Sequence, residues 1–366
     1  MALMNPMRMH GGVAPENYTD FSTPINPLGV PDVIRGLISE SIKSEIYSFY
    51  PNYNYTALRE AIAEFYNIEP SYIIPLNGAA EALYLIVGAE KPTTAIVCEP
   101  TFGDHRALFH ALSMNYISVQ YAEFPNMYVF PFNIVYMLSK SIKSKCIILF
   151  SNPNNPLGTC IPIEVIEKIL HMYRNCIVIV DEAFMDLSRI CKSAFKLVEE
   201  YKNIVILRSL TKTFAVPGLR IGFLYTSNTK LLHKIEVFRQ PWNVNSIADY
   251  VFSRALTDYR NNLNEFLEHS KSVIETERQF LEYSFSELGL HFYKSYAPFI
   301  LVRFHNDVKN IQHFLERFKI WIRDASSFQF LTRYHGRISV RLREDNEKLI
   351  NALRIILKEK VYGEAQ

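Results

Sequence analysis

Lys212 stands among hydroxyl-bearing residues directly after a short apolar run. The segment Arg208–Phe223 reads RSLTKTFAVPGLRIGF, and the apolar run Asn203–Leu207 precedes it. A lysine amine is a nucleophile only when it is deprotonated, and partial burial beside other cations lowers its pKa toward that state. Arg220 supplies such a cation eight positions later. The segment therefore suits a lysine that forms a Schiff base with a carbonyl group, although a surface lysine would give the same pattern.

Two further polar residues lie where predicted strands end. Asp181 belongs to the sequence VDEAF, and Asn155 belongs to NPNNPLG. A carboxylate at a strand end can hold a ring nitrogen in its protonated form, and an amide can donate to a phenolate oxygen. Taken singly, Asp181 would equally suit a helix cap and Asn155 a turn.

A phosphate group also has candidate ligands in the sequence. Asn77 and Gly78 open a helical segment, and the free backbone N–H groups at a helix N-terminus bind phosphate. The hydroxyl of Ser209 and the guanidinium of Arg220 would complete a phosphate cup. Phe102, in CEPTFGDH, could stack on a planar ring, although alone it reads equally well as a core residue.

Together these groups make up one chemical set. It consists of a Schiff-base lysine, a carboxylate for a pyridine nitrogen, an amide for a ring oxygen, a stacking ring and ligands for a phosphate. Pyridoxal 5'-phosphate requires each of them. The sequence therefore predicts this cofactor, and the cofactor explains why a lysine follows directly on a buried strand.

Short apolar runs that alternate with helical patterns must position these residues. The clearest predicted strands are Thr93–Pro100, Lys145–Pro156, Asn175–Phe184, Asn203–Lys212 and Ile221–Thr226. Fully apolar strands alternating with helices predict an α/β domain with a mostly parallel sheet covered on both faces. Ligands of such sheets bind beyond the carboxyl ends of the strands, where the polar clusters fall.

The pattern of predicted helices and strands changes near Trp242. A long helical pattern over residues 272–289, two strands at residues 299–304 and 336–342, and a last helix over residues 344–360 predict a smaller α+β domain. We therefore expect an N-terminal arm (1–30), a large cofactor domain (31–240) and a small C-terminal domain (241–366).

Composition excludes several classes of function. The 366 residues are 49% hydrophobic with a net charge of +2 and no basic tract, so nucleic acid is not an expected partner. The longest apolar runs are too short for a membrane span, and no secretory signal is recognisable, so we expect a cytoplasmic protein. The five cysteines form no C-x-x-C pair, and we expect reduced, buried thiols.

The motifs NPNNPLG, DEAF, SLTKTFAVPGLRIG and GRISV, in this order, resemble the fold-type I pyridoxal-phosphate enzymes of the class I/II aminotransferase superfamily over nearly the whole chain. The resemblance implies a homodimer whose sites lie between subunits. It makes Lys212 the Schiff-base residue and Asp181 the partner of the ring nitrogen. The other cofactor contacts that it implies are Asn155 at the ring oxygen, Phe102 stacked on the ring, Gly78, Ala79, Ser209 and Arg220 at the phosphate, and Tyr50 from the neighbouring subunit.

Two branches of the superfamily are alternatives for the substrate and reaction of this chain. The stretches HGG, DFSTPINPLG and QPWNVN, together with Phe184 in DEAF, resemble L-threonine-O-3-phosphate decarboxylase, an enzyme of cobalamin biosynthesis. Histidinol-phosphate aminotransferase is the alternative. The resemblance implies that Arg337 binds a substrate carboxylate and Arg323 a substrate phosphate, with His10 and Asn26 as co-ligands.

The chain departs from these patterns in places. Ala79 and Ala80 replace residues that often carry hydroxyl or acidic groups, and Leu157 replaces a frequent threonine. Arg341 and Arg343 follow Arg337, so the sequence leaves open which arginine meets which anion. A non-catalytic regulator built on the same fold is a third alternative, which the presence of Lys212 disfavours.

Overall fold

The computed structural model describes residues 11–363, and its centre is a seven-stranded sheet. The strand order is β2 (Ile73–Leu76), β10 (Gly222–Tyr225), β9 (Ile204–Arg208), β8 (Cys176–Asp181), β7 (Cys146–Ser151), β3 (Thr94–Glu99) and β4 (Asn115–Gln120). Only β10 runs antiparallel to its neighbours, and the other adjacent pairs are parallel. The five predicted strands are confirmed, whereas the sequence reading missed β2 and β4.

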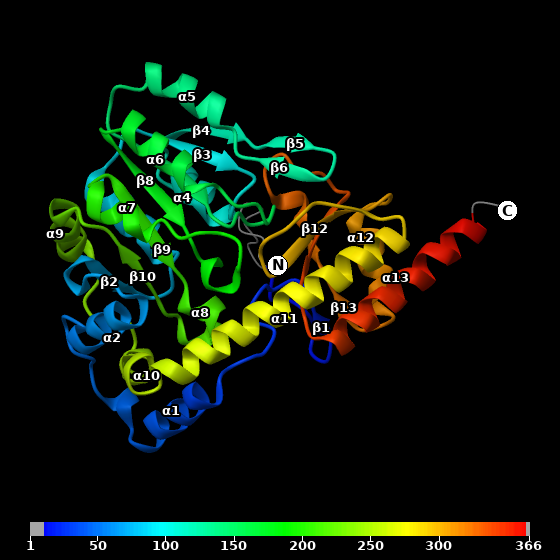
Figure 1. The fold of residues 1–366 in the computed structure, drawn as a ribbon, viewed down its shortest axis with the longest axis horizontal. Helices are drawn as coiled ribbons and strands as arrows, with labels where there is room; N and C mark the ends of the chain where they lie inside the picture. The colour runs from blue at the N-terminus through cyan, green and yellow to red at the C-terminus, as the bar shows by residue number, and fades with distance from the viewer. Residues whose placement is uncertain (1–10, 364–366) are drawn as a thin grey trace.

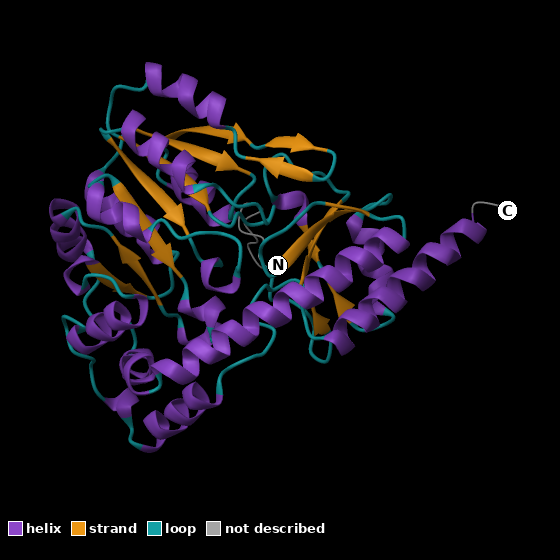
Figure 2. Cartoon of the chain, in the orientation of Figure 1, coloured by secondary structure: helices purple, strands orange, loops and turns teal. Residues whose placement is uncertain are grey.

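Helices cover both faces of this sheet (Figure 2). Successive residues of β7 point to opposite faces, so that Ile148 and Phe150 enter one core cluster while Ile147 and Leu149 enter the other. The described helices are α1 (Asp32–Lys43), α2 (Thr56–Tyr66), α3 (Glu81–Glu90), α4 (Gly103–Ala111), α5 (Phe132–Ser141), α6 (Ile163–Met172), α7 (Phe195–Glu200), α8 (Leu210–Thr213), α9 (Thr229–Phe238), α10 (Ser246–Asp258), α11 (Arg260–Glu287), α12 (Val308–Glu316) and α13 (Arg343–Gly363).

A smaller antiparallel sheet forms the second lobe. Its order is β11 (His291–Phe292), β12 (Phe299–Arg303), β15 (His335–Ser339) and β14 (Arg323–Asp324), and α11, α12 and α13 pack with it around a separate core. Helix α11 begins earlier than the sequence predicted and joins the two lobes (Figure 1). Its Leu263 and Leu267 belong to the first core, and its Leu281 and Phe285 belong to the second.

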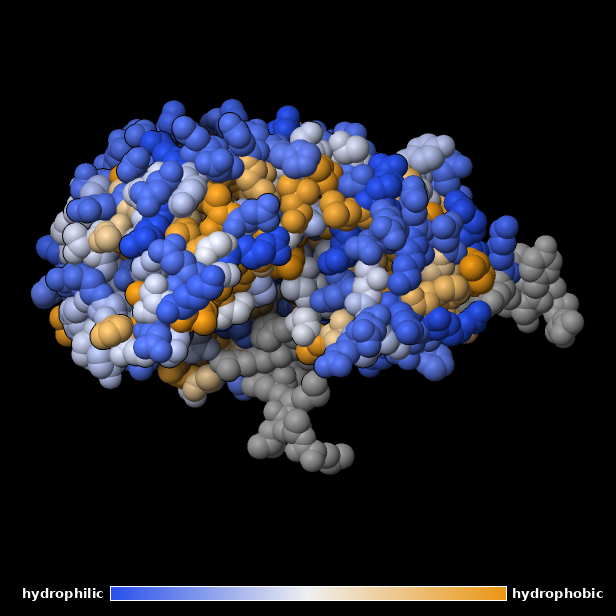
Figure 3. All heavy atoms as spheres, turned by 90° about the horizontal axis from the view of Figure 1, so that it is seen from below, coloured by the Kyte–Doolittle hydropathy of each residue, from blue (hydrophilic) through white to orange (hydrophobic). Residues whose placement is uncertain are grey.

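Two short strand pairs complete the described sheets. The N-terminal arm contributes β1 (Thr19–Asp20), which pairs in parallel with β13 (Ile320–Trp321) of the small lobe. The strands β5 (Ala122–Phe124) and β6 (Met127–Val129) form a hairpin beside the small lobe. The surface seen in Figure 3 is mostly hydrophilic and is interrupted by an apolar area. Among the described helices, none combines the length and apolarity needed to cross a membrane.

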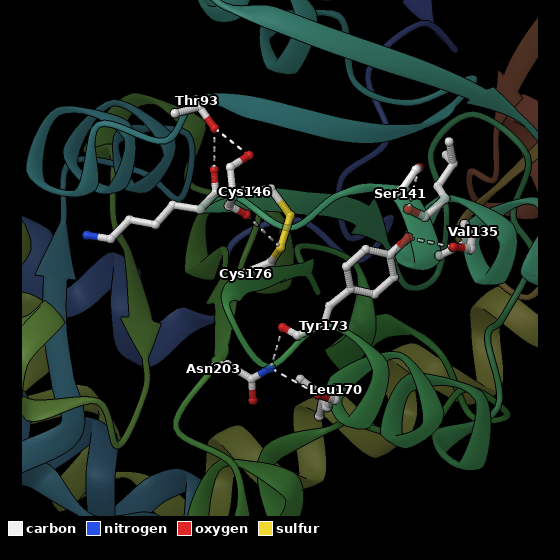
Figure 4. The surroundings of a disulfide bond; sticks show 11 residues. Thr93, Val135, Ser141, Cys146, Leu170, Tyr173, Cys176 and Asn203 are labelled. Atoms are coloured by element: carbon white, nitrogen blue, oxygen red, sulfur yellow. Dashed lines mark hydrogen bonds between the residues drawn. A yellow bond between two sulfur atoms is a disulfide. The ribbon is translucent and has the colours of Figure 1, made fainter.

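The expectation of reduced cysteines is wrong for four of the five. Cys146 pairs with Cys176 and Cys160 with Cys191, while Cys98 is a buried free thiol. Cys146 and Cys176 face each other in the register of β7 and β8, with a Cα–Cα distance of 4.4 Å (Figure 4). The pairing depends on strand adjacency, which the spacing of cysteines along the chain does not reveal.

Candidate active site

The carboxyl ends of four parallel strands meet at one edge of the large sheet. Phe102 follows β3, Asn155 follows β7, Asp181 ends β8 and Lys212 follows β9. All four line one cavity of about 330 Å³, which also receives residues from the small lobe and the N-terminal arm. The polar clusters therefore converge as expected for ligand binding at the end of a parallel sheet.

Lys212 lies in the four-residue helix α8 and faces this cavity. Burial and, secondarily, the nearby cations Arg337 and Arg220 lower the pKa of its amine to about 8, against the opposing effect of Asp181. The neutral, nucleophilic form of the amine is therefore far more populated near neutral pH than in an ordinary lysine.

The carboxylate of Asp181 contacts a histidine that the sequence analysis did not predict as a site residue. Oδ2 of Asp181 lies 3.5 Å from Nε2 of His105, and Oδ1 accepts a hydrogen bond from the backbone N–H of Ala183 at 3.0 Å. Nδ1 of His105 lies 3.4 Å from the hydroxyl of Thr101. His105 lies in the first turn of α4, three residues after the N-cap residue Phe102, and both side chains line the cavity.

The predicted phosphate ligands also line the cavity. Gly78, Ala79, Ser209 and Arg220 all line it, and the hydroxyl of Ser209 lies 2.7 Å from that of Thr211. Gly78 has a φ of +77°, and a Cβ at this position would lie 2.5 Å from an Arg220 guanidinium nitrogen. Glycine thus allows Arg220 to lie against the backbone that opens α3. Thr211 was not predicted as part of this group.

Two arginines of the small lobe enter the cavity side by side. Arg323 in β14 and Arg337 in β15 are direct cross-strand partners. Arg337 donates to Oδ1 of Asn155 and, at 2.7 Å, to the carbonyl oxygen of Ser22. Arg323 donates to Ser327 Oγ at 2.8 Å. Burial, and secondarily the charge of Arg323, lowers the pKa of Arg337 to about 9.

Arg341 and Arg343 do not line the cavity. Arg341 donates to the Asp345 carboxylate at 2.8 Å, and Arg343 contacts the Glu277 carboxylate at 3.1 Å. Their side chains are committed to ion pairs of the small lobe. Among the four arginines that the sequence left open, the cavity receives Arg323 and Arg337.

Two predicted site residues, Tyr50 and Asn26, do not line the cavity of this chain. Tyr50 is 77% exposed and stacks on Trp242 with ring centroids 4.4 Å apart. Asn26 is buried, and its side-chain amide donates to the carbonyl of Thr213 and the hydroxyl of Ser270. His10 lies outside the described residues.

Phe184 and residues of the N-terminal arm also line the cavity. Phe184 contacts Phe299 edge to face at a centroid distance of 5.2 Å, which leaves an apolar ring at this wall. Gly11, Ser22 and Thr23 of the arm also line the cavity, and no motif had marked them individually as site residues.

The described residues fit pyridoxal 5'-phosphate. The cavity combines an amine of lowered pKa, a carboxylate backed by an imidazole, an aromatic ring and a glycine-lined arginine site. The amide nitrogen of Asn155 makes no hydrogen bond within the described part of the chain, while its oxygen is occupied by Arg337. Fold and site therefore define a pyridoxal-phosphate-dependent enzyme of fold type I.

Comparisons with known proteins agree with this class. The family described as aminotransferase class I and II matches residues 16–353. A protein of Caldanaerobacter subterraneus subsp. tengcongensis, provisionally named a threonine-phosphate decarboxylase, is 33% identical over 93% of this chain and 91% of its own length. The adenosylcobalamin biosynthesis bifunctional protein CobDQ of Leptospira interrogans is 31% identical over 97% of this chain, which spans only 40% of that longer protein.

The solved histidinol-phosphate aminotransferase of Clostridium acetobutylicum superposes with a TM-score of 0.83 at 25% identity, covering 93% of this chain and 99% of that one. The chain belongs to the class I/II aminotransferase family. It is an enzyme of this family, and pyridoxal 5'-phosphate, which is present in related solved structures, is its cofactor.

Proposed function

We propose that the chain decarboxylates L-threonine O-3-phosphate to aminopropanol phosphate, a reaction that serves cobalamin biosynthesis. The pairing of Arg323 with Arg337 in one cavity wall carries this proposal. Threonine phosphate presents a carboxylate and a phosphate on one small molecule, and each anion can take one guanidinium. The similarity to the Leptospira and Caldanaerobacter proteins supports the same choice.

Cofactor residues take the following roles in this proposal. Lys212 bears the cofactor, Asp181 keeps the ring nitrogen protonated, and His105 orients Asp181. Asn155 donates to the ring oxygen and Phe102 stacks on the ring. The phosphate of the cofactor is held by the backbone of Gly78 and Ala79, by Ser209 and by Arg220. When bound, pyridoxal phosphate supplies an electron sink for the bond that breaks at the substrate Cα.

Orientation of the substrate decides which Cα bond breaks. Only the bond perpendicular to the plane of the ring overlaps the ring's π system, so two fixed anion contacts select the bond. Arg337 would hold the carboxylate and Arg323 the phosphate. Lys212 in its ammonium form, or a water, would donate the proton that takes the place of the lost carboxylate on Cα. Such positioning is worth several kcal/mol in related cases, on the order of the difference between competing reactions.

Transamination of histidinol phosphate is the second candidate, favoured by the likeness to the aminotransferase of Clostridium acetobutylicum. Histidinol phosphate carries a phosphate but no carboxylate, so it needs only one arginine. The second arginine would then serve a dicarboxylate co-substrate such as 2-oxoglutarate.

A product assay separates the two candidates. The holoenzyme is supplied with phosphothreonine or with histidinol phosphate plus 2-oxoglutarate. The proposal expects release of carbon dioxide from phosphothreonine without any keto acid. Glutamate formation from 2-oxoglutarate with histidinol phosphate, and no carbon dioxide from phosphothreonine, would establish the aminotransferase instead.

We further propose a homodimer in which Tyr50 reaches the cofactor phosphate of the partner subunit. Tyr50 belongs to a set of exposed aromatic side chains close to it in sequence or in contact with it. The set consists of Tyr47, Phe49, Tyr50, Tyr53 and Trp242. Exposed apolar patches of this kind are typical of subunit interfaces. Sedimentation of the wild type and of Trp242→Arg tests the interface, since a monomer in the wild type would contradict it.

A further inference from the structure

Helix α8, which carries Lys212, is too short to satisfy its own carbonyl groups. Four residues leave every carbonyl of the helix without a partner inside it. Downstream amides take the first two, because Phe214 donates to the carbonyl of Leu210 and Val216 to that of Thr211, both at 3.0 Å. The last two carbonyl groups require donors from elsewhere in the chain.

Asn26 of the N-terminal arm supplies both donors. Its backbone N–H donates to the carbonyl of Lys212 at 3.1 Å, and its side-chain Nδ2 donates to the carbonyl of Thr213 at 3.0 Å. The other Nδ2 proton goes to Ser270 Oγ in α11 at 2.8 Å, and Oδ1 accepts from the N–H of Leu28. Asn26 is 1% exposed, so water does not compete for these bonds.

The same arm segment also holds the small lobe. The carbonyl of Phe21 accepts from the N–H of Ser339 at 2.9 Å, and the carbonyl of Ser22 accepts from Arg337 at 2.7 Å. Ser22 and Asn26 are four residues apart. This short strap, Phe21–Asn26, therefore joins the arginine wall of the cavity to the backbone of the reactive lysine.

We propose that Asn26 is a positioning residue for Lys212. It closes the C-terminal end of α8, fixes the backbone from which the lysine side chain extends, and keeps it in register with Arg337 through the strap. The inference rests on the proposed role of Lys212 as the residue that bears the cofactor. Misplacing a reacting group by about 1 Å can cost a rate factor of about 10².

Three variants of the holoenzyme test this role. Asn26→Ala removes the side-chain donor to α8, and Asn26→Asp keeps the size but turns carboxylate oxygen toward the Thr213 carbonyl. Ser270→Ala is the matched control, because it removes the third partner of the same amide without touching α8. The readouts are kcat, KM and the pH titration of the visible absorption band of the lysine-bound cofactor, measured well below the unfolding temperature of every variant.

We expect Asn26→Ala to lower kcat about 10- to 100-fold and to shift the midpoint of the absorption titration, with a larger effect for Asn26→Asp. Ser270→Ala should lower the unfolding temperature. Its kcat should stay within twofold of the wild-type value, and its titration midpoint should not shift. If Asn26→Ala behaves like Ser270→Ala in all readouts, Asn26 only stabilises the fold and the inference is overturned.

Two additions keep the test decisive. If Asn26→Asp does not fold, Asn26→Ser, whose hydroxyl can donate one bond, should give an intermediate shift of the titration. Mapping of the cofactor attachment site separates this inference from the proposed function. Attachment at Lys212 with an unshifted titration in Asn26→Ala contradicts only the role of Asn26, whereas attachment elsewhere contradicts both.

Discussion

Oδ2 of Asp181 lies 3.5 Å from Nε2 of His105, and neither side chain is more than 13% exposed. The imidazole in turn contacts Thr101, whose hydroxyl lies 3.0 Å from that of Ser151 at the end of β7. Asp181 is therefore oriented by a polar chain that leads back into the sheet, which is the arrangement needed to aim a carboxylate at a fixed ring atom.

Asp181→Asn keeps the shape of this side chain but removes the charge that would keep a ring nitrogen protonated. We expect kcat to fall on the order of 10²- to 10³-fold, the range seen when one electrostatic contact to the reacting group is lost. Steady-state kinetics check this, together with the absorption spectrum of the bound cofactor. An unchanged kcat in a fully loaded variant would show that Asp181 does not face the ring.

The buried amine of Lys212 makes the stability of the cofactor-free protein depend on pH. Its pKa is lowered from 10.5 to about 8 in the folded chain, so between these values the unfolded chain binds more protons. The free energy of unfolding therefore rises with pH across this window, by about 3 kcal/mol for this group.

The matched comparison is Lys212→Met, which lacks the titrating amine. Denaturant unfolding of both apoproteins is measured at several pH values from about 7 to 10.5. The free energy of unfolding of the wild type should rise relative to that of the variant as pH rises. A constant difference between the two proteins would mean that the pKa of Lys212 is not lowered.

Arg337→Gln should separate substrate binding from cofactor binding. Loss of one charged hydrogen-bond partner costs about 1.5–3 kcal/mol, so kcat/KM for phosphothreonine should fall roughly 10- to 100-fold while the cofactor still binds. Arg341→Gln is the control, because Arg341 pairs with Asp345 outside the cavity lining. Equal losses in both variants would argue against a specific role for Arg337.

The two disulfides predict a thiol count and a stability loss. The unfolded, unreduced protein should expose one reactive thiol, that of Cys98, rather than five. Removing either bridge, as in Cys160→Ala with Cys191→Ala, should lower the free energy of unfolding by about 2–4 kcal/mol. A count of five thiols would contradict both pairings.

Much of the site could be predicted because its residues sit at strand ends in short motifs. Lys212, Asp181 and Asn155 each follow a buried run, and parallel strands bring such ends together whatever the intervening sequence. The type of each side chain then limits its chemistry. For these residues, sequence order and fold class were sufficient to predict the convergence at one cavity.

Features that the sequence did not reveal depend on contacts between residues remote in sequence. Asn26 lies in a motif that resembles a substrate-binding stretch, yet its amide bonds to a carbonyl 187 positions away. Cys146 and Cys176 meet only because β7 and β8 are neighbours in register. His105 carries no local signal, since a histidine in an amphipathic helix is common. Each of these requires three-dimensional adjacency that periodicity does not encode.

The most direct test of the account is the attachment site of the cofactor. The holoenzyme is reduced with borohydride, digested and mapped by mass spectrometry, with Lys212→Ala treated in parallel. We predict a single pyridoxyl group on the peptide that contains Lys212 and none in the variant. A pyridoxyl group on another lysine, or the same labelling in Lys212→Ala, would contradict the account.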